Sequence, residues 1–164
     1  MDLDTYPDIA GCSGGWSVPS IVDTFAPACG QVSGDDSDNP SGQGCNVADL
    51  CEVGWHVCTD PADVMASSPT GCMGATQQDD PTLFFVQRQS GPGNAGCGEG
   101  ANDLFGCGNH GAVPNVNCTP LDRFSGNLCG AIGAPWMCGN DGFAEASNVT
   151  KGDSAVGGVL CCRD

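Results

Sequence analysis

The stretch KGDSAVGGVLCC, residues 151–162, says most about the fold of this chain of 164 residues. Its second half, GGVLCC, is an apolar run that predicts a buried strand, and Gly152 and Asp153 predict the turn that leads into it. Adjacent residues of a strand point to opposite faces of a sheet. We therefore expect Cys161 and Cys162 to form disulfides with two different partners, so that this strand anchors two bridges.

Ser154, in the same stretch, raises a catalytic hypothesis. His56, Asp103 and Ser154 follow one another in the order used by trypsin-like serine proteases, and the Gly-Asp-Ser triplet resembles the loop around their nucleophile. However, Ala155 and Val156 stand where those enzymes have the two glycines that shape the oxyanion hole. We therefore interpret the triplet as a turn, and we predict that the chain is not an enzyme.

Cysteine and glycine dominate the composition, with 13 and 26 residues. This cysteine density is typical of disulfide-stabilised extracellular domains. A structural zinc site is not expected, because the sequence has no C-x2-C pair and its single C-x2-H spacing, Cys107 to His110, has no second half. The odd count predicts six disulfides, and the thirteenth cysteine would pair outside the chain, stay free or have lost its partner through truncation. Twelve of the following thirteen residues are therefore expected to pair: Cys12, Cys29, Cys45, Cys51, Cys58, Cys72, Cys97, Cys107, Cys118, Cys129, Cys138, Cys161 and Cys162.

The charge excludes several classes of partner. Only 4 Lys and Arg oppose 20 Asp and Glu, for a formal net charge of -16, so nucleic acid is not an expected partner and anionic membranes are disfavoured. No apolar run approaches the roughly 20 residues of a membrane span. The first residues do not resemble a signal peptide, and we interpret the chain as a mature or excised extracellular segment. Candidate glycosylation sequons at Asn117 and Asn148 agree with this localisation.

The chain divides by composition at residue 44. Residues 1–44 are interpreted as an N-terminal arm that ends in an acidic loop (residues 33–44, SGDDSDNPSGQG), and residues 45–164 as a cysteine-rich body. Within the body, Asn46 predicts the N-cap of one short helix ending at Gly54, and Asp60 with Pro61 predicts the start of a second. The run TLFFVQRQ, residues 82–89, predicts a strand.

The cysteines between these strands recur at nearly even spacing, with Gly, Asn and Pro between them, as in short strands joined by turns. Together these features predict a small, disulfide-rich and loop-rich α+β domain. It would contain two short helices and short antiparallel strands.

Calcium is the candidate cofactor. Asp35, Asp36, Asp38 and Asn39 place four hard oxygen ligands in the acidic loop beside flexible glycines. A second oxygen-rich group is formed by Asn140, Asp141 and Glu145. The alternative is a solvated acidic loop, which any chain of this charge would contain.

The body also resembles the C-type lectin-like domain. The residues that carry the resemblance are CEVGWHVC (51–58), the following DPADVMASSPTGC (60–72), PWMCGNDG (135–142) and the closing GGVLCC. The resemblance covers residues 45–162 and implies that fold. The calcium and sugar motifs of the family (Glu-Pro-Asn, Gln-Pro-Asp and Trp-Asn-Asp) are missing, so it implies no ligand residues here.

Two functions remain as hypotheses. The first is an extracellular recognition or adhesion module that binds a glycan or a protein through surface loops, with calcium as a candidate aid. The second is a structural subunit of a cell-surface layer or extracellular filament, in which copies of the chain are partners and the odd cysteine links them.

Overall fold

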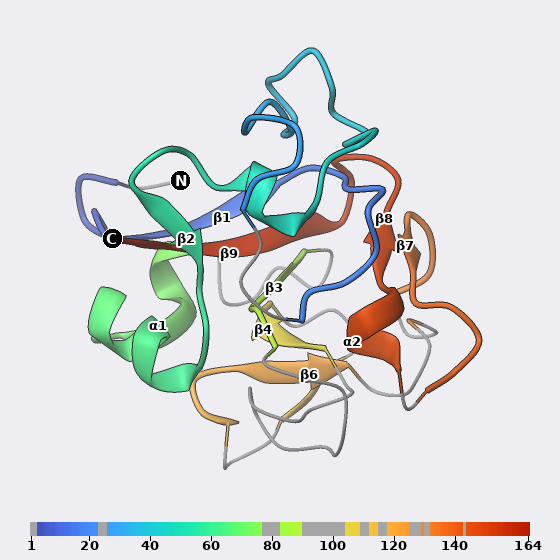
Figure 1. Cartoon of the computed structure of the whole chain (residues 1–164). Helices are drawn as coiled ribbons and strands as arrows, with labels where there is room; N and C mark the ends of the chain where they lie inside the picture. The colour runs from blue at the N-terminus through green and yellow to red at the C-terminus, as the bar shows by residue number, and fades with distance from the viewer. Residues whose placement is uncertain are drawn as a thin grey trace.

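The computed structural model shows a mixed sheet built around the C-terminal strand (Figure 1). Within the described residues, no helix is long and apolar enough to cross a membrane. The structure describes residues 3–22, 26–76, 83–89, 104–108, 112–114, 118–124, 129, 132–142 and 144–164.

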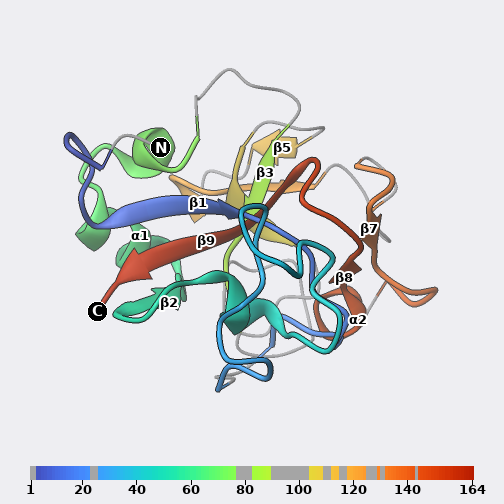
Figure 2. The same ribbon diagram turned by 90° about the horizontal axis from the view of Figure 1, so that it is seen from above.

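Strand β9 (Gly157–Arg163) lies next to the edge strand β1 in the larger sheet, and three strands pair with it. β1 (Ile9–Ser13) lies antiparallel along one side of β9, while β2 (Trp55–Val57) and β3 (Phe84–Val86) pair with the other side. Figure 2 shows β1 and β2 on opposite sides of β9. The sheet continues from β3 through β4 (Phe105–Cys107) and β6 (Asp122–Phe124) to β5 (Ala112–Pro114), and a separate pair joins β7 (Trp136–Met137) to β8 (Thr150–Lys151).

The expected strand at 157–162 is confirmed, and the one expected at 82–89 is present as the shorter Phe84–Val86, but the prediction of antiparallel pairing is wrong for one pair. β3 runs parallel to β9, with Phe84 opposite Gly157. A parallel pair needs a long connection, which the cysteine-rich middle of the chain supplies. The two glycines that open β9 allow close approach: a Cβ on Gly157 would lie 2.0 Å from the Phe84 carbonyl oxygen, and one on Gly158 would lie 2.1 Å from that of Cys12.

Both helix N-termini that the sequence predicts are present in the structure. Asp60 caps α1 (Pro61–Ser67) by accepting the backbone N–H groups of Ala62 and Asp63. Asn46 caps a single turn of 3-10 helix, η1 (Val47–Leu50), which ends before the disulfide-bonded Cys51 rather than at Gly54. The structure adds two short elements that were not expected: η2 (Gly71–Gly74) and α2 (Glu145–Asn148).

The two cysteines at the end of β9 do have different partners. Cys161 bonds to Cys51 and Cys162 bonds to Cys58. The first disulfide lies in a cluster of buried residues that includes Phe84, and the second lies in another cluster. Because neighbouring residues of β9 face opposite ways, the pair fastens both faces of the sheet to the segment 51–58.

The remaining cysteines leave one free thiol within the described residues. Cys118 is also disulfide-bonded, Cys97 lies outside the described residues, and Cys12 is free and half-buried. Three further disulfides are Cys29–Cys45, Cys72–Cys107 and Cys129–Cys138.

The segment that the sequence sets apart as an arm contributes to the main sheet. Five residues of β1 pair with β9, and Ile9 is fully buried. Trp16 is also fully buried, and its indole N–H donates to the Val149 carbonyl oxygen. Described residues on both sides of residue 44 therefore belong to the same two clusters of buried residues.

Candidate ligand-binding groove

A groove with a volume of ≈ 980 Å³ lies along β1, and we call it the β1 groove. Residues 10–13 of β1 form its floor. Gly11 faces η2 and β3, since a Cβ there would lie 2.4 Å from the Ala75 carbonyl oxygen and 2.8 Å from the Phe85 ring. Cys12, the next residue, points to the opposite face, where the loop 31–37 and the end of η1 form the other wall.

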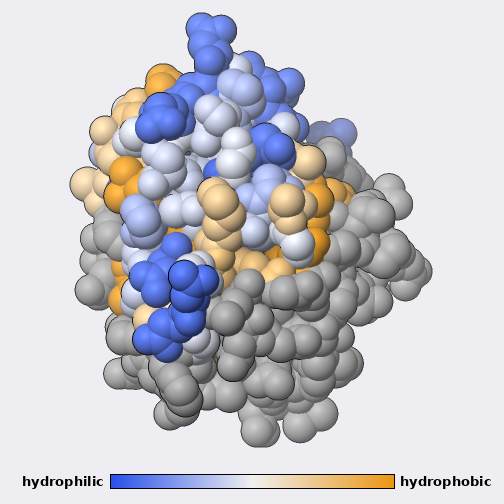
Figure 3. Space-filling view, turned by 90° about the vertical axis from the view of Figure 1, so that its right-hand side faces the viewer, coloured by the Kyte–Doolittle hydropathy of each residue, from blue (hydrophilic) through white to orange (hydrophobic). Residues whose placement is uncertain are grey.

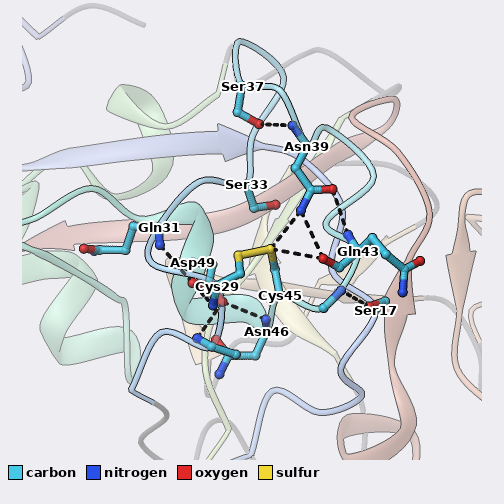
Figure 4. Close-up of a disulfide and its surroundings, with 12 residues drawn as sticks. Ser17, Cys29, Gln31, Ser33, Ser37, Asn39, Gln43, Cys45, Asn46 and Asp49 are labelled. Atoms are coloured by element: carbon cyan, nitrogen blue, oxygen red, sulfur yellow. Dashed lines mark hydrogen bonds between the residues drawn. A yellow bond between two sulfur atoms is a disulfide. The ribbon is translucent and has the colours of Figure 1, made fainter.

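The loop wall is held by one buried carboxylate, that of Asp49 in η1 (Figure 4). Its Oδ1 accepts the backbone N–H groups of Cys29 and Gln31 at 2.9 and 3.0 Å, and its Oδ2 accepts those of Ala28 and Asn46 at 2.9 and 2.8 Å. Hydrogen bonds to an ionised acceptor are stronger than neutral ones. Asp49 thus fixes the chain at the point where it enters the groove wall.

The acidic loop continues from this anchor and is stabilised by its own side chains (Figure 4). The Cys29–Cys45 disulfide ties its end to the Asp49 anchor. Asn39 donates from its side-chain nitrogen to the Gln43 carbonyl oxygen at 3.1 Å and accepts the Gln43 N–H at 3.0 Å. Ser33 donates to the Gly15 carbonyl oxygen at 2.6 Å. The loop therefore has a defined backbone although much of its surface is exposed.

The predicted calcium ligands lie in this loop, but the structure does not bring them together. Asp35, Asp36 and Asp38 are exposed, and the Oδ1 of Asn39 is used within the loop. Among the described residues, each group of three potential metal ligands within 4.8 Å contains two disulfide-bonded cysteines, and none includes these aspartates. Calcium binding by the acidic loop stays a prediction.

The second oxygen-rich group is divided between surface and core. Asn140 and Asp141 are exposed, whereas Glu145 is fully buried in α2. The Glu145 Oε1 accepts the backbone N–H of Cys129 at 3.0 Å. This geometry gives Glu145 a structural task beside the Cys129–Cys138 disulfide.

The β1 groove is acidic. Asp35, Asp36 and Glu52 line it with exposed carboxylates, and none of its described lining residues carries a positive charge. The loop that bears two of these carboxylates rises at the top of Figure 1, and Figure 3 shows hydrophilic residues gathered at that end of the molecule. An acidic groove favours cationic ligands.

Cys12, on the groove floor, is kept in its thiol form. Burial, with the charges of Glu52 and Asp35 acting in the same direction, raises the pKa of Cys12 from 9.0 to about 12. Because the thiolate is the reactive species, this cysteine is a poor nucleophile at neutral pH.

The protease hypothesis fails on geometry. His56 lies in β2 beside the C-terminal end of β9, whereas Ser154 precedes the N-terminal end of that strand. The two ring nitrogens of His56 face the carboxylates of Asp63 and Asp164, at 3.1 and 2.8 Å. Asp103 lies outside the described residues. Ser154 lies in the turn before β9, as the sequence predicts.

Lys151 is a buried cation that sequence reasoning did not single out. Its ammonium group donates to the carbonyl oxygens of Gly14, at 3.0 Å, and Asp153, and lies 5.7 Å from the centre of the Trp136 ring. Burial lowers the pKa of Lys151 from 10.5 to about 8, against the opposing effect of the charges of Asp153 and Asp35. The residue connects β8 to the chain that follows β1.

Of the two candidate glycosylation sites, Asn148 is exposed at the last position of α2, and Asn117 lies outside the described residues. His110, of the C-x2-H spacing, also lies outside them.

No family model matches the chain, and no solved structure matches it. The resemblance to the C-type lectin-like domain therefore stays an expectation.

Sequence reasoning missed the two residues that define the groove most directly. The bond between Asp49 and the Asn46 backbone could have been predicted, because Asn46 and Asp49 have the spacing of a capping box. The bonds of Asp49 to residues 28–31 could not be foreseen, since they depend on the tertiary fold. Cys12 could not be distinguished from the other cysteines without their pairing.

Proposed function

We propose that the chain is an extracellular recognition module whose ligand, a glycan or a protein, binds in the β1 groove. The observation that carries this proposal is the groove itself, of ≈ 980 Å³, whose exposed wall is a surface loop on a disulfide frame. Binding residues are often carried by loops on a rigid scaffold. The disulfides support an oxidising compartment.

Pre-organisation supports the same proposal. Asp49 and the Cys29–Cys45 disulfide fix the groove wall before a ligand arrives, so binding loses less conformational entropy. Exposed Leu3 and Met73 add apolar surface to the acidic rim. Calcium is retained as a candidate aid, because Asp35 and Asp36 line the groove and are exposed.

The alternative, a structural subunit linked through the odd cysteine, has less support. The free thiol among the described residues is Cys12, which is half-buried in a strand of the main sheet. Its pKa is raised to about 12, and both properties disfavour a disulfide between two copies.

The test is a binding screen on glycan and peptide arrays, with and without calcium, using the whole chain. Asp36→Lys, in the groove, is compared with Asp38→Lys, an exposed residue of the same loop that does not line it. We expect a ligand whose binding is changed by Asp36→Lys and not by Asp38→Lys. Equal effects of the two variants, or a disulfide-linked ladder on a non-reducing gel with no array ligand, would contradict the proposal.

A further inference from the structure

β1 is an edge strand whose open edge lies in the groove. The Asp8 carbonyl oxygen accepts the Arg163 N–H at 3.0 Å at one end of the β1–β9 pair, and at the other end Gly14 donates to the Gly157 carbonyl oxygen at 3.4 Å. Antiparallel pairs alternate between bonded and non-bonded residues. The even-numbered residues of β1 therefore bond to β9, and the odd-numbered ones direct their N–H and C=O groups away from it.

Two odd-numbered residues of β1 line the groove, Gly11 and Ser13. The Ser13 carbonyl oxygen accepts the Asp35 N–H at 3.1 Å. The Ser13 N–H and both backbone groups of Gly11 have no hydrogen-bond partner within the described part of the chain. Unpaired backbone groups on a sheet edge are a template for another strand.

We infer that the open edge of β1 binds an extended segment of a partner protein as an added strand, and that this segment alternates basic with apolar side chains. The inference rests on the proposed function, since it names the ligand class of the same groove. Strand addition to an exposed sheet edge is an established mode of peptide recognition, in which backbone bonds give affinity and pockets for alternate side chains give specificity.

The alternation follows from the two walls. A residue of the added strand opposite Gly11 projects to the face of Gly11, where the Phe85 ring and, packed against its cluster, Leu83 line the groove beside the Ala75 carbonyl oxygen. A residue opposite Cys12 projects to the other face, where Glu52 and Asp35 lie near enough to raise the pKa of the thiol. Apolar and basic side chains are the complements of these two walls.

Charge also excludes a second copy of the chain as the occupant. Each copy carries a formal charge of -16, and its own β1 edge carries Asp35 and Glu52. Pairing two such edges would bring like charges together, which is destabilising. A partner that supplies Lys or Arg relieves the repulsion instead.

The first experiment uses an acetylated heptapeptide that alternates lysine with valine, and a heptapeptide of the same composition with the order scrambled. Binding to the whole chain is measured by titration calorimetry. We expect the alternating peptide to bind at least about tenfold more tightly, because only it places valines on one wall and lysines on the other. Equal affinity would show that charge alone attracts the peptide and would overturn strand addition.

The backbone bonds are tested by N-methylation of the peptide. In an antiparallel pair, the residue opposite Gly11 exchanges both bonds with it and projects to the apolar wall, so methylation of the valines removes the bonds and methylation of the lysines does not. Amide signals of Gly11 and Ser13 should also become protected from hydrogen exchange when the peptide binds. The inference would be overturned if methylated valines and methylated lysines both abolished binding, or if neither did. Unchanged hydrogen exchange at Gly11 and Ser13 would also overturn it.

Charge variants separate this inference from the proposed function. Glu52→Gln should weaken the alternating peptide about two- to fivefold, as expected for one exposed ion pair, while Asp38→Asn should leave it unchanged. If a glycan binds in an Asp36-dependent way and the peptide does not bind, the strand-addition inference fails and the proposed function stands. If no glycan depends on Asp36 and the peptide does not depend on Glu52, both fail.

Discussion

The substitution Asp49→Asn tests whether one buried carboxylate organises the groove wall. The carboxylate accepts four backbone N–H groups, two on each oxygen, from Ala28, Cys29, Gln31 and Asn46. Asparagine keeps one oxygen and directs its NH2 group at two N–H donors. A hydrogen bond to a charged group contributes about 1.5–3 kcal/mol, so two lost bonds should lower the free energy of unfolding by about 3–6 kcal/mol.

The assay is guanidinium denaturation of the oxidised protein, with amide hydrogen exchange to locate the change. A loss of this size is a large part of the total stability of a domain, about 5–15 kcal/mol. The exchange of the Gln31 and Cys29 amides should accelerate more than that of β9. A decrease below about 1 kcal/mol with unchanged exchange at Gln31 would refute the reasoning.

The matched control is Asp60→Asn. Asp60 also accepts two backbone N–H groups, at 2.8 and 2.9 Å, but it does so at an exposed helix N-cap. Asparagine is as good an N-cap as aspartate. We therefore expect Asp60→Asn to change the free energy of unfolding by less than about 0.5 kcal/mol. A large loss in this variant would show that the substitution, and not the buried geometry, causes the effect.

The other predictions follow from charge and cysteine chemistry. Cys12 in the native protein should react with iodoacetamide at pH 8 at least about a hundredfold more slowly than a free cysteine, because its pKa is raised to about 12; rapid native labelling would contradict this. Folding lowers the pKa of Lys151 from 10.5 to about 8, so the unfolded chain binds more protons than the folded one between pH 8 and pH 10.5. The contribution of Lys151 to the free energy of unfolding should therefore rise with pH over this range, by up to about 3 kcal/mol. Urea denaturation at pH 8 and 10 should therefore show a steeper rise for the native protein than for Lys151→Met, and parallel profiles would exclude the effect. The mass of the unreduced protein should be that of six disulfides, and more than one reactive thiol would count against it. Millimolar Ca²⁺ should raise the melting temperature more than Na⁺ of equal ionic strength, and the double variant Asp36→Asn, Asp38→Asn should abolish the difference; equal shifts would indicate plain screening.

Local signals in the sequence predicted local structure well. Asp60 and Pro61 predicted the first turn of α1, and both α1 and the Asn46 cap are present as expected. The adjacent cysteines of β9 could be assigned different partners because strand geometry alone separates their directions. In each case the physical cause lies within a few residues.

Features that depend on distant segments were not predictable in the same way. The parallel pairing of β3 with β9 and the entry of β1 into the sheet join residues far apart in the chain, and several topologies would satisfy the same apolar patterns. The relative placement of the candidate calcium ligands was also not predictable from the sequence, and calcium binding stays a prediction. Asp35, Asp36 and Asp38 are neighbours in sequence, but the backbone of the loop spreads their carboxylates over its surface.

The acidity of the groove also bears on how the fold tolerates an odd cysteine. Cys12 packs against the cluster that contains the Cys51–Cys161 disulfide. Disulfide exchange proceeds through attack of a thiolate on a disulfide sulfur, so a thiol that stays protonated does not start it. Burial together with the charges of Glu52 and Asp35 keeps the thiol protonated, so the same carboxylates that favour a basic ligand also keep the odd cysteine out of disulfide exchange.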